Sequence, residues 1–247
     1  MKERWLLVMG VALLTVVFSS AFCVLWSIQT NNEIMPDTET LFQLETFNTF
    51  CSGKYGGYMS YQELAEHGDF GIGTFDKLDG EMIALDRVFY QIPFDGNPKQ
   101  VDPNMTAPNA TVTFFDADET KTLIGPVNYS EIQTNILSFM PKKNAIYAIK
   151  ISGNCLYAQT RSVPAQTKPY PILADVVKNQ SVFDLTNVFA TAVGFWFPSS
   201  MDDVDYAGFH FHLITDDHSA GGHLLEFIIE NATIEIDQIN NFNLVLP

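Results

Sequence analysis

Three of the five histidines in the chain lie close together near its C-terminal end, at His210, His212 and His223. Between residues 208 and 215, apolar side chains alternate with the first two histidines. This period of two is typical of a β-strand that carries both histidines on one face. A polar, glycine-containing stretch follows, and a second strand pattern begins at His223. If the two strands form a hairpin, His212 and His223 share a face about 5 Å apart, with His210 as a diagonal neighbour.

Three imidazoles arranged in this way can hold one metal ion at about 2.0–2.1 Å from each nitrogen. A single strand histidine usually has a structural role, but two at i and i+2 opposite a third favour a metal site. Three protein ligands leave a fourth position for water or substrate, as in catalytic zinc sites. Zinc is therefore the expected cofactor, although iron, nickel, cobalt and copper also accept imidazole ligands.

The elements that must position these histidines form a strand-rich, mixed α+β fold. Two four-residue patterns, Ser60–Glu63 and Ser130–Gln133, fit capping boxes at helix starts. We expect helices at 41–50, from Ser60 to Gly68, from Ser130 to Pro141 and at 173–177. We expect strands within 70–91 and at 111–115, 145–152, 156–160, 192–197, 209–215, 223–230 and 233–236, with 145–152 and 156–160 as a hairpin. The resulting architecture is a mixed β-sheet lobe plus a smaller barrel-like β lobe that carries the metal site.

The N-terminal segment predicts export. A basic start, Met-Lys-Glu-Arg, precedes an uncharged run from Trp5 to Ile28, which is long enough to cross a bilayer. Residues 1–28 are therefore expected to be a cleaved signal peptide or an N-terminal membrane anchor formed by residues 5–28. The protein would then be secreted, or held outside the cytoplasm by that anchor. Residues 29–40 are expected to be a linker, and residues 41–247 a single domain.

The composition limits the kinds of partner. The formal net charge of −16 argues against nucleic acids and anionic membrane surfaces as ligands. An acidic small-molecule substrate would need a local cation in the site. Cys51 and Cys155 could form a disulfide in an oxidising compartment, although two free thiols are the favoured alternative.

Two further motifs accompany the histidine segment. The run HGDFGIGTFDKLDGEMI occupies residues 67–83, and TRSVPAQTKPY occupies residues 160–170. Together with GFHFHLITDDHSAGGH at 208–223, they resemble the ordered motifs of alpha-acetolactate decarboxylase, and the resemblance covers about residues 41–247. It implies a zinc-dependent carboxy-lyase that converts 2-acetolactate (2-hydroxy-2-methyl-3-oxobutanoate) to acetoin and CO2. Members of this family are often homodimers.

The resemblance also implies roles for individual residues. It makes His210, His212 and His223 the metal ligands, Arg161 and Glu81 active-site residues, and Thr74 a residue that lines the substrate pocket. The substrate is a β-keto acid, so loss of its carboxylate leaves electrons that a metal-stabilised enediolate can hold. Arg161 would bind the substrate carboxylate, and Glu81 would deliver or relay the proton that quenches the enediolate.

One departure from the family keeps alternatives open. Family members usually continue past the segment that resembles residues 243–247, and their extra tail brings a second glutamate to the active site. Here that carboxylate is missing, or its role falls to Asp216, Asp217 or Glu226. His218, in the expected turn, should face solvent. The alternatives are an exported, non-catalytic homologue that binds a metal or ligand, and another zinc hydratase or hydrolase with a three-histidine site; a cupin is a weaker fit.

Overall fold

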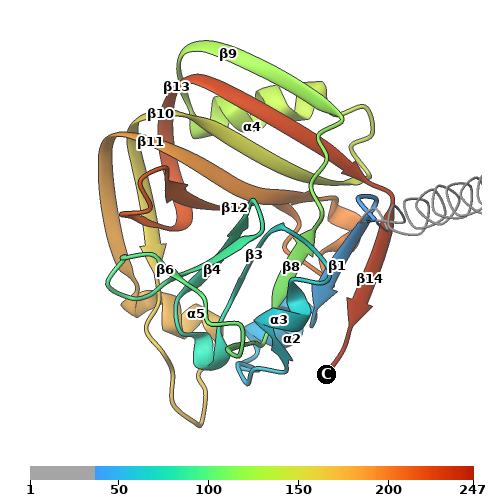
Figure 1. Ribbon diagram of the computed structural model, residues 1–247, viewed down its shortest axis with the longest axis vertical. Helices are drawn as coiled ribbons and strands as arrows, with labels where there is room; N and C mark the ends of the chain where they lie inside the picture. The colour runs from blue at the N-terminus through green and yellow to red at the C-terminus, as the bar shows by residue number, and fades with distance from the viewer. Residues whose placement is uncertain (1–36) are drawn as a thin grey trace, which may run out of the picture. The chain divides into compact units, whose positions relative to one another are not determined.

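A computed structural model describes residues 37–247 of the chain, in which two β-sheets account for most of the structure (Figure 1). The predicted signal peptide or anchor at 1–28, and most of the predicted linker at 29–40, lie outside the described residues. Within residues 37–247, no helix has the length and apolar composition needed to cross a membrane.

The first sheet is mixed and has seven strands in the order β14-β1-β8-β3-β4-β5-β6. The first two of these run parallel to each other, and every other neighbouring pair is antiparallel. The strands, in chain order, are β1 (Thr40–Leu44), β3 (Phe70–Thr74), β4 (Glu81–Leu85), β5 (Val88–Ile92), β6 (Lys99–Gln100), β8 (Ala110–Thr113) and β14 (Asn241–Val245).

The second sheet has five long antiparallel strands, in the upper part of Figure 1. They are β9 (Glu119–Asn128), β10 (Ile146–Ser162), β11 (Ser181–Phe197), β12 (Gly208–Thr215) and β13 (Gly221–Ile239). Because β10 pairs with both β11 and β13, the strands β10, β11, β12 and β13 close into a ring. This ring is the barrel-like lobe that the sequence predicts, and it carries the three histidines.

The remaining elements are short. They are α2 (Phe47–Cys51), the strand pair β2 (Met59–Ser60) and β7 (Thr106–Ala107), α3 (Tyr61–Leu64), α4 (Tyr129–Phe139), α5 (Leu173–Val176) and three 3-10 turns, η1 (Asp76–Leu78), η2 (Val177–Asn179) and η3 (Ser199–Met201). The longest helix within residues 37–247, α4, packs against the second sheet through Ile132 and Ile136, which are fully buried.

The helix starts were predicted better than the helix lengths. The capping box of Ser60 and Glu63 is present, but α3 ends at Leu64 and does not reach Gly68. The cap of α4 is Asn128, paired with Glu131, so the prediction of Ser130 as the cap was wrong by two residues. The predicted helix at 41–50 was also wrong in its first half, because residues 40–44 form β1 between two partner strands and sheet pairing outweighs a weak local preference.

The predicted hairpin of 145–152 and 156–160 was wrong, because β10 is one strand of 17 residues. Gly153 resembles a turn signal, but here it belongs to a bulge where the pairing with β13 shifts register. In the same way, 223–230 and 233–236 belong to the single strand β13, whose bulge lies at Asn231 with a φ of 54°. A strand paired on both sides tolerates such bulges, so local turn signals overestimate the number of strands.

The core between the two sheets fixes where they meet. Phe70, Ile72 and Ile83 from the first sheet pack in one buried cluster with Val193 and Phe195 from the ring. Cys51 and Cys155 are both free, so the free-thiol alternative is confirmed for these two residues. The contact between the sheets brings β3 and β4 to the side of the ring that holds the histidines.

Asp237 on β13 gives a prediction about stability. Its carboxylate is buried near Asp118, Glu39 and Asp116, and burial together with these charges raises its pKa to about 7. The folded-state pKa thus exceeds the unfolded value, so the ionised form destabilises the fold at high pH and protonation relieves this as the pH falls through 7. We expect Asp237→Asn to raise the free energy of unfolding by about 2 kcal/mol at pH 8 and by much less at pH 5.

Urea denaturation of both proteins at the two pH values measures this difference. Exposed Glu66→Gln makes the same change of charge on the surface and should leave the free energy of unfolding nearly unchanged. An equal gain at pH 8 and pH 5 would contradict the assignment of the effect to ionised Asp237.

Candidate active site

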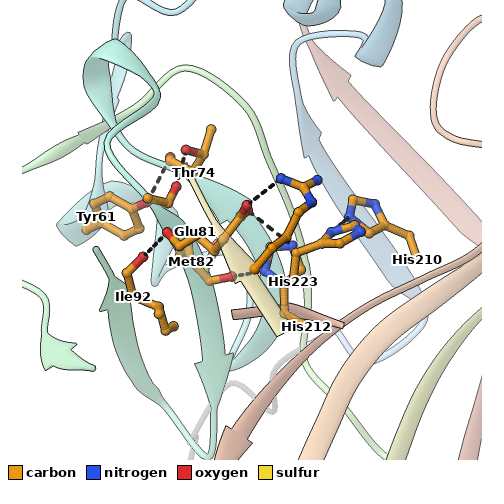
Figure 2. A network of polar contacts seen from close by, with 11 residues as sticks. Tyr61, Thr74, Glu81, Met82, Ile92, His210, His212 and His223 are labelled. Carbon is orange, nitrogen blue, oxygen red and sulfur yellow. Dashed lines mark hydrogen bonds and ion pairs between the residues drawn. The ribbon is translucent and has the colours of Figure 1, made fainter. Parts of the chain in front are cut away.

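The three histidines converge as their spacing predicts. His212 on β12 lies directly opposite His223 on β13 in the strand register. One potential ligand nitrogen from each of His210, His212 and His223 lies within 4.8 Å of the other two, so one ion can contact all three. Figure 2 shows the three rings turned toward one another.

A glycine allows β10 to join this group of side chains. Arg161 on β10 is the cross-strand partner of His223. Gly222, beside His223, has a φ of +137°, and a Cβ added there would lie 2.4 Å from the carbonyl oxygen of Arg161. Only glycine satisfies both conditions, so Gly222 permits the close approach of β13 to β10 at the site.

A buried ion pair links the ring to the first sheet. Nη1 of Arg161 donates to Oε1 of Glu81 over 3.1 Å, and the two side chains are only 14% and 8% exposed. Glu81 is the first residue of β4 and lies opposite Thr74 on β3. Burial raises the pKa of Glu81, while the Arg161 guanidinium opposes that shift. Because the pair has little exposure to water, the Coulomb attraction between its two charges is stronger than in a surface ion pair.

His212 has a fixed orientation. Its Nδ1–H donates a hydrogen bond to the carbonyl oxygen of Met82 over 2.8 Å, so Nε2 carries the free electron pair. That Nε2 also lies 3.5 Å from Oε2 of Glu81 (Figure 2). A backbone carbonyl that holds the second nitrogen of a histidine is a common support for a metal ligand.

The electrostatics favour neutral imidazoles. Burial lowers the pKa of His212 to about 3, and burial and nearby positive charge lower the pKa values of His210 and His223 well below the usual range. Metal ions bind the neutral form of histidine, so this donor set is ready for a metal near neutral pH. Nε2 of His210 and Nδ1 of His223 lie 3.2 Å apart, close enough to face the same ion. The residues present therefore fit a three-histidine metal site.

These groups line one cavity of about 390 Å³, a volume typical of small-molecule sites. All six residues singled out in the sequence lie on its wall: Thr74, Glu81, Arg161, His210, His212 and His223. Apolar side chains from both sheets and the short helices complete it, among them Phe47, Leu78, Val163, Leu173, Phe209 and Leu224. The hydroxyl of Thr74 is engaged, because it donates to the Gly80 carbonyl oxygen over 2.6 Å.

The carboxylates suggested as substitutes for a second active-site glutamate lie elsewhere. Asp216, Asp217 and Glu226 are exposed, and none of them lines the cavity. The carboxylate of Asp217 instead accepts hydrogen bonds from Thr215 and Ser219 within the turn. His218 is exposed beside the ring of Tyr90, as expected for a residue of the turn.

The cavity does contain a second carboxyl group, that of Asp205. This residue was not singled out from the sequence, because it lies in a loop ahead of β12 and belongs to no pattern of strand, helix or ligand spacing. Tyr129 and Gln133 on α4 also line the cavity and were missed for the same reason: only the fold brings their helix to the site.

Comparison with known proteins agrees with this arrangement. The family model described as alpha-acetolactate decarboxylase matches residues 41–247. An alpha-acetolactate decarboxylase of Methanosarcina mazei is 42% identical over 226 residues, which cover 90% of this chain and 78% of that protein. The enzyme of the same name from Bacillus subtilis is 37% identical over 84% of this chain and 81% of its own length.

Solved structures give the same result for the fold. A crystal structure of alpha-acetolactate decarboxylase from Bacillus subtilis strain 168 superposes with a TM-score of 0.82 at 36% identity, covering 84% of this chain and 89% of that one. A Staphylococcus aureus protein described as similar to alpha-acetolactate decarboxylase also gives a TM-score of 0.82, at 31% identity over 84% of this chain and 89% of that one. The chain therefore belongs to the alpha-acetolactate decarboxylase family of carboxy-lyases.

Proposed function

We propose that this protein decarboxylates 2-acetolactate to acetoin and CO2 with zinc held by His210, His212 and His223. The observation that carries the proposal is the buried Arg161–Glu81 pair beside three neutral imidazoles in one cavity. The reaction of a zinc hydratase or hydrolase does not require a carboxylate on the substrate, so it does not by itself account for Arg161. Decarboxylation of a keto acid uses all five side chains, those of Arg161, Glu81 and the three histidines.

Arg161 is the cation that an anionic substrate needs in a protein with a net charge of −16. Its contact with Glu81 occupies one nitrogen, Nη1, and a guanidinium has five N–H donors in a planar fork. The remaining donors can bind the substrate carboxylate and orient the bond that breaks. As CO2 departs, the negative charge of the substrate carboxylate is no longer beside Arg161. The contact with Glu81 then keeps the guanidinium in place.

Glu81 is placed to transfer the proton that replaces CO2 on the substrate carbon. It lies between Arg161 and His212, so it contacts both the group that binds the carboxylate and one of the metal ligands. A zinc ion held by the three histidines would supply Lewis-acid stabilisation of the negative charge that decarboxylation leaves on the substrate. Burial raises the pKa of Glu81 above the usual range of a carboxyl, which makes this group suited to deliver or relay a proton to the carbon that has lost CO2.

We also propose that the protein acts outside the cytoplasm as a homodimer. Export is supported by the basic start and long uncharged run of residues 1–28. The homodimer is supported by the resemblance to family members that associate in this way.

The first prediction of this proposal concerns turnover. Purified protein supplied with racemic 2-acetolactate should form acetoin above the spontaneous rate, lose this activity after treatment with a chelator, and regain it on addition of zinc. A colorimetric assay of acetoin, run beside a protein-free sample, measures it. Bound zinc without acetoin above the spontaneous rate would rule out the proposed reaction.

The second prediction concerns the metal. His212→Ala removes a buried ligand and should weaken zinc binding by at least about 100-fold, because even outer-shell changes cost roughly 10- to 100-fold. His218→Ala is the matched control, since His218 is exposed in the turn outside the cluster. Zinc content after dialysis against a weak chelator is the measurement. Equal zinc content in both variants would contradict the three-histidine site.

The third prediction concerns Arg161. Arg161→Lys keeps the positive charge but loses the planar fork, so we expect kcat/KM to fall about 100-fold while zinc content is unchanged. Arg87→Lys, on a residue that is 75% exposed, makes the same exchange outside the cavity. Steady-state kinetics of both variants measure the effect. If the two variants behaved alike, Arg161 would not bind the substrate carboxylate.

A further inference from the structure

Asp205 lies on the wall of the cavity that also holds Glu81 and the three histidines. It is in the loop between η3 and β12 and is 5% exposed. Among the described residues that line this cavity, Glu81 and Asp205 are the only carboxylic acids. The cavity therefore contains two acids in two different settings, and the proposed function so far uses only Glu81.

The side chain of Asp205 is held in place without a cation. Its Oδ1 accepts a hydrogen bond from the backbone N–H of Tyr206 over 2.6 Å, and its Oδ2 accepts one from the hydroxyl of Thr111 over 3.1 Å. No lysine, arginine or histidine in residues 37–247 forms an ion pair with it, whereas Glu81 has Arg161. A buried carboxyl without a counter-ion favours its protonated form.

The surroundings of Asp205 contain few charges that could reverse this preference. Nearby titratable groups are Cys51 on α2 and Tyr206 beside it, with Glu81, Arg161 and His210 on other parts of the cavity wall. Burial and the charge of Asp205 raise the pKa of Cys51 to about 11, so this thiol stays neutral. Thr111 on β8 and Asn109, which directly precedes that strand, also line the cavity and are uncharged. Burial raises the pKa of Asp205 to about 6, and the hydrogen bonds from Tyr206 and Thr111 limit the rise.

We propose that Asp205 is the second acid of the active site and the source of the proton that decarboxylation consumes; this inference rests on the proposed function. The bond from the substrate carbon to its carboxylate breaks, CO2 leaves, and the electron pair stays on the substrate. The O–H bond of Asp205 breaks, and its proton passes through cavity water and Glu81 to that carbon, where a C–H bond forms. Asp205 then regains a proton from solvent, beside the half-exposed Tyr206.

The first test is Asp205→Asn in the zinc-loaded full chain. Asparagine keeps the shape and one acceptor oxygen but carries no acidic proton. We expect kcat to fall about 100-fold with KM little changed, as for loss of a general acid. The wild-type kcat should fall as the pH rises through about 6, because the form with protonated Asp205 is the active one. This falling limb of the pH profile should be absent from the variant.

Asp202→Asn is the matched control, since Asp202 is exposed in the same loop, and its kcat and pH profile should equal those of the wild type. Thr111→Val tests the proposal without removing the acid. Loss of the hydroxyl that donates to Asp205 should move the limb to higher pH while activity at pH 5 is retained. Zinc content and thermal midpoints show whether each variant folds.

The outcomes separate this inference from the proposed function. Wild-type protein that forms no acetoin would overturn both. Active wild-type protein with an Asp205→Asn variant that keeps its kcat within twofold and its pH limb would overturn the role of Asp205 alone. A limb that Thr111→Val does not move would overturn it as well, even if Asp205→Asn failed to fold.

Discussion

The arrangement of the site depends on the ion pair between Arg161 and Glu81. Arg161 belongs to the ring of long strands and Glu81 to the seven-stranded sheet, so their 3.1 Å contact joins the two sheets inside the cavity. Each charge is buried, and each would be costly without the other; removing one partner of such a pair typically costs about 3–5 kcal/mol. The pair therefore keeps the two halves of the site together and holds both side chains at the cavity wall.

Strand register does the rest of the positioning. Arg161 lies opposite His223, which lies opposite His212, so three adjacent strands of the ring each bring a residue to one row. Because the ring is closed, none of these strands can shift register without disturbing both of its neighbours. The metal ligands and the arginine are thus fixed by backbone hydrogen bonds and need no support from loops.

The parts of this site that could be predicted from sequence are those that short patterns encode. Alternation placed His210 and His212 on one face, and the spacing to His223 gave the correct pairing. The fold class followed from the density of strand patterns. The lengths of β10 and β13 did not, because their bulges resemble turns and only pairing on both sides keeps them continuous. Asp205 could not be found because its importance comes from burial, which no local pattern reports.

The pairing of β1 with β14 has a consequence for the order of events during synthesis. These parallel strands come from opposite ends of the described chain, and β14 covers one whole edge of β1. Until β14 has left the ribosome, that edge carries unpaired backbone N–H and C=O groups, and the sheet cannot be completed. A partly made chain would then expose one open edge of β1 for most of its synthesis, a period in which chaperones would protect it from aggregation.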